Sequence, residues 1–164
     1  MILLLLSNPI SASHHPGYIS TSPGKEHFTL AESGKTTTLI IDPEDYPGVI
    51  IALGDLITDI GRVTQYEPAM IFDALPGEEE LVIVGMLGES RLVQQLVDKG
   101  KLDATALEGK WETFIIQTFD DPFPEVERAL VIAGSDKRGT LYGIYDVSEQ
   151  IGVSPWYWWA DVPV

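Results

Sequence analysis

The fold is decided by two adjoining stretches, which read Ala129-Leu130-Val131-Ile132-Ala133-Gly134 and Ser135-Asp136-Lys137-Arg138-Gly139. An apolar run without alternation is typical of a strand that is covered on both faces. The polar residues and glycines that follow predict a tight turn, after which Leu141, Ile144 and Ser148 recur at helical spacing. We therefore expect a buried strand that leads directly into a helix ending at Gln150.

Further apolar segments extend this pattern towards the N-terminus. Residues 81–85 read Leu-Val-Ile-Val-Gly, which predicts a second strand buried on both faces. Residues 46–64 place apolar side chains three and four apart, as in an amphipathic helix, and the acids of 42–45 would lie at its N-terminal end. Ser90 is expected to cap a shorter helix that runs to Lys99.

The remaining strands are expected to be shorter, at 27–30, 36–41, 69–74 and 111–119. In the last of these, alternation places Trp111 on one face together with Thr113, Ile115 and Gln117, and residues 120–124 are expected to break the strand. The sum is an α+β fold, in which two larger helices and one shorter helix pack on a mixed β-sheet.

The first 25 residues differ in character from the rest of the chain. Residues 1–6 are apolar, no Lys or Arg precedes Lys25, and residues 7–23 are rich in Ser, Pro and Gly. This composition fits a weak or truncated signal peptide, a disordered lead or an initial strand, and the sequence leaves these alternatives open. One domain with its own core is expected over 26–164.

The charge balance excludes several classes of partner. The chain has 10 Lys and Arg against 25 Asp and Glu, a net charge of −15, which argues against binding to nucleic acid or to anionic membranes. No apolar run approaches the length of a membrane span. The absence of cysteine excludes disulfides, a thiol nucleophile and thiolate metal ligands.

Patterns typical of catalytic, phosphate or metal sites fail on spacing. Residues 34–37 read Gly-Lys-Thr-Thr, but Thr29 stands where a phosphate-binding loop needs glycine, and a strand follows instead of a helix. His14 and His15 lie in a Ser- and Pro-rich stretch that offers no rigid ligand spacing. No Gly-x-Ser-x-Gly motif is present, and the many neighbouring acids are typical of solvated turns. We expect no metal site and no cofactor.

The turn at 134–139 is a candidate binding site with two interpretations. Its backbone N–H groups and the adjacent Asp136, Lys137 and Arg138 could hold an anionic part of a substrate. Alternatively, Asp136 or Ser135 caps the helix and Arg138 pairs with a nearby carboxylate. The sequence favours this second, structural interpretation.

The C-terminal segment holds three of the four tryptophans, in the run Trp156-Tyr157-Trp158-Trp159. Aromatic side chains at this density are typical of carbohydrate platforms or protein interfaces, because flat rings bury a large area at low entropic cost. We expect this segment to dock on further chain or on a partner.

Residues 129–164 resemble the N-terminal domain of glycoside hydrolase family 115, the xylan α-1,2-glucuronidases. The more specific mark is the run Ser154-Pro155-Trp156-Tyr157-Trp158-Trp159-Ala160-Asp161-Val162. The pattern Arg-Gly-x-x-Tyr-Gly at 138–143 is shared more widely, with N-terminal α/β domains of hexosaminidase-like and other glucuronidase families. Residues 40–64 also resemble the family, and the similarity extends over about 26–164.

The resemblance implies an enzyme that removes glucuronic acid, or its 4-O-methyl ether, from glucuronoxylan by inversion, with an acid and a base carboxylate flanking the bond. In the family these carboxylates lie in the (β/α)₈ barrel and later domains, so no catalytic residue is assigned here and the chain alone is expected to be inactive. The implied partners are the barrel of the same chain, on which Trp156–Trp159 would pack, and xylan bound by the full enzyme. A secreted location is also implied.

A second hypothesis is an independent carbohydrate-binding module that uses Trp156, Trp158 and Trp159 as a stacking platform. The charge of −15 is poorly suited to attract a uronate, so recognition should come from cations elsewhere in the enzyme. A remaining alternative is that residues 136–138 reach over the barrel mouth and position the sugar carboxylate.

Overall fold

The computed structural model describes residues 3–5, 10–11, 17–22, 24, 27–72, 75, 77 and 80–154. Three α-helices lie in this part of the chain: α1 (Pro47–Thr64), α2 (Arg91–Asp98) and α3 (Lys137–Gln150). A short 3₁₀ turn, η1, covers Ala104–Ala106. The segment 156–159 lies outside the described residues.

The described strands form a mixed sheet and a smaller antiparallel one. The mixed sheet has the order β2-β9-β10-β8-β6-β7, and its members are β2 (Ile10–Ser11), β6 (Thr38–Ile41), β7 (Met70–Phe72), β8 (Glu80–Met86), β9 (Phe114–Phe123) and β10 (Val126–Gly134). Strands β7, β6, β8 and β10 run parallel, whereas β9 runs antiparallel to β10 and β2 antiparallel to β9. The smaller sheet has the order β3-β1-β4-β5, with β1 (Leu3–Leu5), β3 (Ile19–Ser20), β4 (Phe28–Glu32) and β5 (Lys35–Thr36). The expected α+β class is confirmed.

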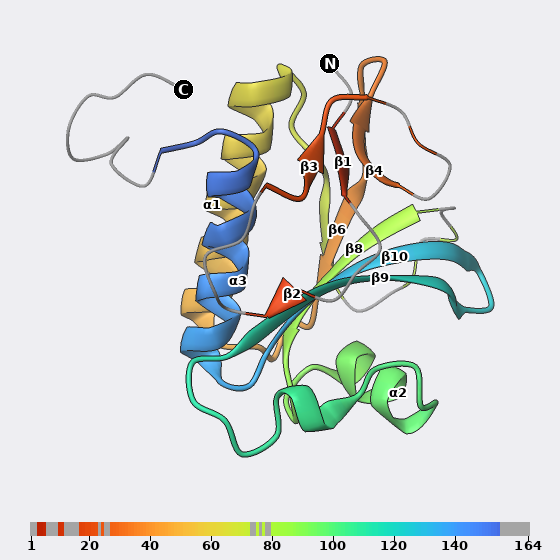
Figure 1. Cartoon of the computed structure of the whole chain (residues 1–164), viewed down its shortest axis with the longest axis vertical. Coiled ribbons are helices and arrows are strands. Elements are labelled where there is room, and N and C mark those ends of the chain that lie inside the picture. Colours follow the sequence, from red (N-terminus) through yellow and green to blue (C-terminus); the bar gives the residue numbers. More distant parts are fainter. Residues whose placement is uncertain are drawn as a thin grey trace.

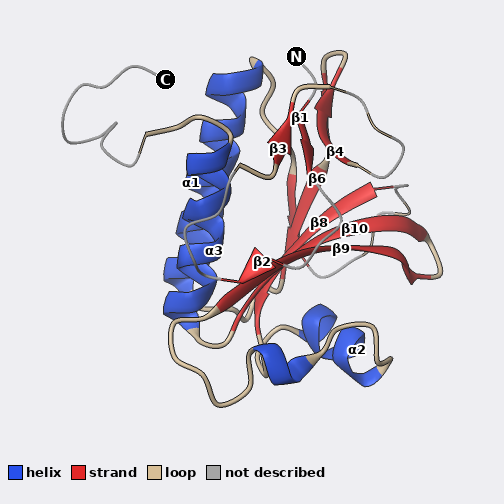
Figure 2. Ribbon diagram, viewed as in Figure 1, coloured by secondary structure: helices blue, strands red, loops and turns tan. Residues whose placement is uncertain are grey.

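Helices cover both faces of the mixed sheet. Helices α1 and α3 lie side by side on one face, and α2 lies on the other (Figures 1 and 2). Along β8, Val82 and Val84 belong to the core beneath α1 and α3, whereas Leu81 and Ile83 belong to the core beneath α2. This division explains why the run at 81–85 is apolar without alternation, as predicted.

The helices begin and end close to their predicted bounds, but the acids before the first helix do not serve its dipole. Tyr46 precedes α1 without a side-chain cap, proline occupies the first turn, and no acid lies in that turn. Asp42 and Asp45 instead bind groups in the loops after β6 and β8. Ser90 caps α2 as predicted, by accepting a hydrogen bond from the backbone N–H of Val93.

The strand predicted at 36–41 is two strands. Residues 35–36 pair with β4 in the smaller sheet, and residues 38–41 enter the mixed sheet between β7 and β8. The backbone N–H of Thr37 donates to the carbonyl of Leu30 at this transition. One continuous segment rich in β-branched residues therefore joins the two sheets. The residue pattern of the segment itself does not indicate this change of pairing partner.

The strand predicted at 111–119 is displaced at both ends. It begins at Phe114, so Trp111 is not on a strand face, and it continues through residues 120–123. Pro122 is tolerated because the pairing with β10 shifts here: Arg128 lies opposite Asp120 and Val126 opposite Phe123. A proline in such a bulge costs no ladder hydrogen bond.

Part of the segment before residue 26 packs on the domain. Tyr18 is buried, and its hydroxyl donates to Asp146 Oδ2 of α3 at 2.7 Å. Residues 3–5 pair as an initial strand with β3 and β4. Among the described residues, no helix is long and apolar enough to span a bilayer.

Candidate functional site

The carboxyl ends of the parallel strands define one edge of the mixed sheet. The loops after β6, β8 and β10 begin at this edge. The loop that precedes β9 ends here, because β9 runs in the opposite direction. The chain leaves β6 into α1 on one face and β8 into α2 on the other. In α/β sheets, ligands bind in the crevice between neighbouring strands whose following connections leave on opposite faces of the sheet. The side chains at this edge are therefore the first candidates for a binding site.

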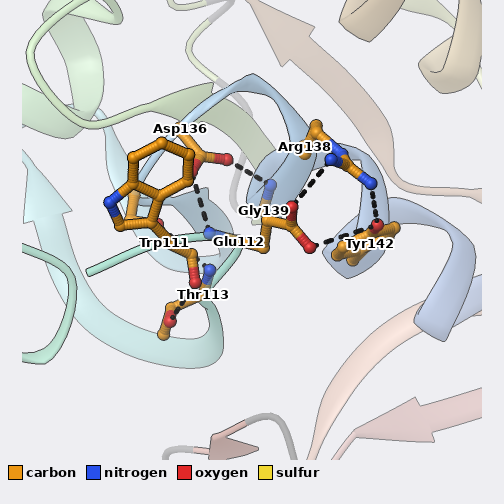
Figure 3. Close-up of polar contacts among 8 residues, drawn as sticks. Trp111, Glu112, Thr113, Asp136, Arg138, Gly139 and Tyr142 are labelled. Atoms are coloured by element: carbon orange, nitrogen blue, oxygen red, sulfur yellow. Dashed lines mark hydrogen bonds and ion pairs between the residues drawn. The ribbon is translucent and has the colours of Figure 1, made fainter.

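Asp136 organises the turn between β10 and α3. Its Oδ1 accepts a hydrogen bond from the backbone N–H of Gly139 at 2.8 Å and caps the helix. Its Oδ2 accepts from the backbone N–H of Glu112, also at 2.8 Å, in the loop that enters β9 (Figure 3). Burial acts to raise the pKa of Asp136, but the N–H groups of Glu112, Gly139 and Arg138 outweigh it and lower the pKa below its ordinary value.

The loop at 110–113 is fixed against this turn by further backbone contacts. The N–H of Thr113 donates to Ser135 Oγ at 3.1 Å, and the N–H of Ser135 donates to the carbonyl of Thr113 at 2.8 Å. A Cβ added at Gly139 would overlap the same carbonyl, so only glycine allows the helix to begin here. Glu112 has φ +52°, a left-handed conformation, and its N–H and that of Thr113 are both bound by the turn.

An ion pair closes the site from the side of α3. Arg138 Nη1 lies 2.8 Å from Glu112 Oε1, and Arg138 Nη2 donates to the hydroxyl of Tyr142 at 3.0 Å. That hydroxyl in turn lies 3.4 Å from Glu112 Oε2 (Figure 3). The carboxylate therefore has partners on both of its oxygens, and the guanidinium is oriented by two side chains.

A hollow of about 370 Å³ lies beside these contacts and is lined by Lys110, Trp111, Glu112, Asp136, Lys137 and Arg138. Trp111 is 86% exposed, more than any other large hydrophobic side chain of the described residues. Lys137 lies with its ammonium 5.5 Å from the ring centre of Tyr46, at the start of α1. The hollow thus combines one free aromatic face with several cationic side chains.

A second group of carboxylates lies at the ends of β6 and β8, where the connections to α1 and α2 leave on opposite faces of the sheet. Asp42 Oδ2 lies 2.7 Å from Arg91 Nε, and Asp42 Oδ1 accepts from the N–H of Glu44. Burial acts to raise the pKa of Asp42, but Arg91 and the backbone donors lower it below the ordinary value. Asp45 is buried and accepts from the N–H groups of Tyr46 and Met86. Burial raises the pKa of Asp45 in spite of these bonds.

The structure places some of the residues predicted as site candidates together and leaves others outside the described part of the chain. Asp136 caps α3 and Arg138 pairs with Glu112, which are the contacts of the structural interpretation, and both also line the hollow with Lys137. The aromatic run at 156–159 lies outside the described residues, so its docking role stays a prediction. Residues 33–34 form the turn between β4 and β5, with both φ values positive, and not a phosphate-binding loop. No group of three or more acidic or histidine side chains in the described part of the chain is placed to hold a metal ion.

Lys110, Glu112 and Tyr142 belong to the site without having been predicted there, and Trp111 lies off the strand face on which it was predicted. Alternating polarity predicts a strand over 111–117, although Gly109, two residues before this segment, is a turn signal. Gly109 has φ +70°, and the chain does turn there. A tryptophan between two charged residues beside a turn is a signal for an exposed ring, and it was available in the sequence.

The comparisons with known proteins point to one enzyme family. The chain matches no protein-family model and none of the curated proteins. A solved structure matches with 32% identity and a TM-score of 0.60 over 76% of this chain: a family GH115 4-O-methyl-α-glucuronidase, BtGH115A, with specificity for decorated arabinogalactans. The match covers 15% of that enzyme, so the chain spans a small part of the relative's length. Over the matched part, this chain is related to the glycoside hydrolases of family GH115.

Proposed function

We propose that the chain is the non-catalytic N-terminal accessory domain of an α-glucuronidase. The observation that carries the proposal is the match itself: 76% of this chain corresponds to only 15% of a GH115 enzyme. A segment of that size corresponds to a small part of the enzyme, which supports the role of a companion domain. The enzyme would remove glucuronic acid or its 4-O-methyl ether from a polysaccharide by inversion, using carboxylates of a following (β/α)₈ barrel.

The chemistry of the carboxyl edge supports a non-catalytic role. An inverting glycosidase needs an acid that can give up a proton to the leaving oxygen and a base that can activate water. Asp42, Glu112 and Asp136 each have both oxygens bound to protein donors. The buried Asp45 accepts two backbone N–H groups as well. Their hydrogen bonds and ion pairs hold loops in place, which supports a structural role for these four carboxylates.

Two substrate classes are compatible with the family. The sequence resemblance favours glucuronoxylan, whereas the enzyme that matches in structure is specific for decorated arabinogalactans. Both polysaccharides carry uronic acid on a largely neutral backbone. We take the glucuronic acid side chain as the shared target and xylan as the first backbone to test.

Partner and location follow from the same proposal. The domain would pack on the barrel of its own chain through Trp156, Tyr157, Trp158 and Trp159. The enzyme would act outside the cell, where plant polysaccharides are found.

The experiment compares the 164-residue chain with the product of the reading frame extended past Val164. Both proteins are incubated with glucuronoxylan and with a decorated arabinogalactan, and released 4-O-methylglucuronic acid is measured. We expect release from the longer protein only, with the product first appearing as the β-anomer by NMR. Release by the 164-residue chain alone would contradict the accessory role, and a longer protein that is inactive on both substrates would contradict the enzyme assignment.

The alternative function is an independent carbohydrate-binding module based on Trp156, Trp158 and Trp159. Trp158→Ala should then abolish binding of xylan oligosaccharides to the 164-residue chain in isothermal titration. A chain that binds no xylan oligosaccharide would exclude this module and leave the accessory role intact.

A further inference from the structure

The backbone that carries the exposed ring of Trp111 is held in place at the carboxyl edge of the sheet. The residues on its C-terminal side are tied down, since the N–H groups of Glu112 and Thr113 donate to Asp136 and Ser135. The carbonyl of Trp111 itself accepts from Thr113 Oγ1 at 3.0 Å. A ligand that stacks on this ring therefore meets a loop that is already ordered, which lowers the entropic cost of binding.

The hollow beside the ring carries a charge unlike that of the whole protein. Its lining has cationic side chains at 110, 137 and 138 and anionic ones at 112 and 136, in a chain whose net charge is −15. Glu112 is neutralised by Arg138, and Asp136 is satisfied by backbone donors. Lys110 and Lys137 form no ion pair within the described residues. Lys110 is thus available to an anion beside the exposed ring, and Lys137, whose ammonium lies 5.5 Å from the ring centre of Tyr46, adds a second positive charge that no described carboxylate neutralises.

We infer that this hollow binds a sugar acid: a pyranose ring stacks on the indole of Trp111, and its carboxylate meets the ammonium groups of Lys110 and Lys137. Sugar rings present an apolar C–H face that packs flat on tryptophan, and the volume of about 370 Å³ is within the range of small-molecule sites. The choice of uronate as the source of the carboxylate rests on the proposed function.

The overall charge restricts the ligand further. A polyanion with one charge per residue would bring many charges near a surface of net charge −15 and be repelled. A single carboxylate on a neutral carbohydrate concerns only the local cations, because at physiological salt charges farther than about 8 Å are largely screened. The hollow therefore suits a sparsely decorated polysaccharide and not a nucleic acid or a sulfated glycan.

The test uses a ligand pair that differs in one group. Methyl α-D-glucuronide and methyl α-D-glucoside share the ring and differ at C6, where the first has a carboxylate and the second a hydroxymethyl group. Each is titrated into the ¹⁵N-labelled 164-residue chain, and the indole N–H signal of Trp111 is followed after assignment with Trp111→Phe. We expect a saturable shift with the glucuronide and an affinity for the glucoside that is lower by about threefold or more. The difference in affinity between the two ligands should disappear at high salt.

Matched variants separate the ring from the cations. Trp111→Ala should weaken glucuronide binding about tenfold or more, as for an aromatic anchor, whereas Tyr66→Ala, at a tyrosine that is 51% exposed outside the hollow, should leave it unchanged. Lys110→Gln with Lys137→Gln should bring the glucuronide to the affinity of the glucoside. Circular dichroism checks that each variant is folded.

Three results would overturn the inference. They are the absence of a saturable shift, equal binding by wild type and Trp111→Ala, and equal binding of the two glycosides at low salt. If the sugars do not bind and Trp111→Ala instead weakens the association of this domain with the rest of the extended enzyme, the hollow is a domain contact. Each result is independent of whether the extended enzyme releases glucuronic acid, so failure here leaves the proposed function standing.

Discussion

Substitution Asp136→Ala tests whether one carboxylate holds the candidate site together. The variant loses the cap of α3, which is typically worth about 1 kcal/mol, and a charge-assisted hydrogen bond to the N–H of Glu112, worth about 1.5–3 kcal/mol. Release of Glu112 from φ +52° returns about 1 kcal/mol of backbone strain. The net loss in the free energy of unfolding is therefore about 1.5–3 kcal/mol, a large fraction of the stability of a domain.

The measurement is urea unfolding of the 164-residue chain followed by circular dichroism, together with a thermal scan. For a domain of this size, about 2–4 °C in Tm accompanies each kcal/mol, so a decrease of about 3–12 °C is expected. Asp136→Asn keeps one acceptor oxygen but places an amide N–H₂ against the other backbone donor, and an intermediate loss is expected. Asp98→Ala, which removes an exposed bond to Gln94 on α2, should change stability by less than about 0.5 kcal/mol.

The pH dependence supplies an independent check. The folded-state pKa of Asp136 lies below its ordinary value of 3.8, so its stabilisation is complete above that pH and is lost as pH falls through the folded-state pKa. The difference in stability between wild type and Asp136→Ala should therefore shrink in acid. If Asp136→Ala costs less than about 0.5 kcal/mol at neutral pH, the two hydrogen bonds from Glu112 and Gly139 to Asp136 do not hold this edge together.

Further predictions concern the same edge and the helix pair. Gly139→Ala should destabilise the domain by about 2–4 kcal/mol in urea unfolding, because the new Cβ meets the carbonyl of Thr113 and backbone must shift; a change below about 0.5 kcal/mol would show that the helix start adapts freely. Burial, followed by the hydrogen bond to Asp55, raises the pKa of Tyr145 to about 12, so its contribution to stability is present below pH 10 and lost as pH rises towards 12. Ultraviolet titration of tyrosinate, with Tyr145→Phe as the reference, measures this pKa, and ordinary titration near 10 would contradict it. Asp42→Asn should cost about 1–3 kcal/mol at neutral pH and little below the folded-state pKa, which is lowered; denaturation at several pH values tests the sign.

The core could be predicted from the sequence because its signal is local. A strand covered on both faces must be apolar at every position, and residues 81–85 and 129–133 have no other common explanation in a chain this short. The long helix likewise follows from apolar spacing, and Val49, Leu53 and Ile60 are buried as the pattern requires. These elements are specified by their own residues.

The displaced elements depend on partners that are distant in the sequence. The strand continues through Pro122 because β10 shifts its pairing opposite the proline, and Lys99 and Lys101 of the loop after α2 donate to carbonyls at 120–122. The residues near 122 in the sequence do not predict these contacts. Propensity correctly marks proline as a strand breaker, and tertiary structure overrides it at one bulge.

The same dependence explains the candidate site. Trp111 leaves the strand because Glu112 turns, and Glu112 turns because Asp136 and Ser135 lie beside it, more than 20 residues along the chain. The sequence contained both interpretations of Asp136-Lys137-Arg138, as a cap or as an anion site. In the structure, Asp136 and Arg138 carry out the structural task while Lys137 stays at the rim of the hollow.

The pattern Arg-Gly-x-x-Tyr-Gly at 138–143 can now be given a physical meaning. Arg138 and Tyr142 are one helical turn apart and together hold the two oxygens of Glu112. Gly139 admits the carbonyl of Thr113, and at Gly143 an added Cβ would lie 2.9 Å from Ile132 of β10. Every defined position of the pattern thus seats α3 on the sheet or fixes the loop that presents Trp111. Such a pattern requires no catalytic explanation, and the chemistry it supports lies with the ring and the free cations next to it.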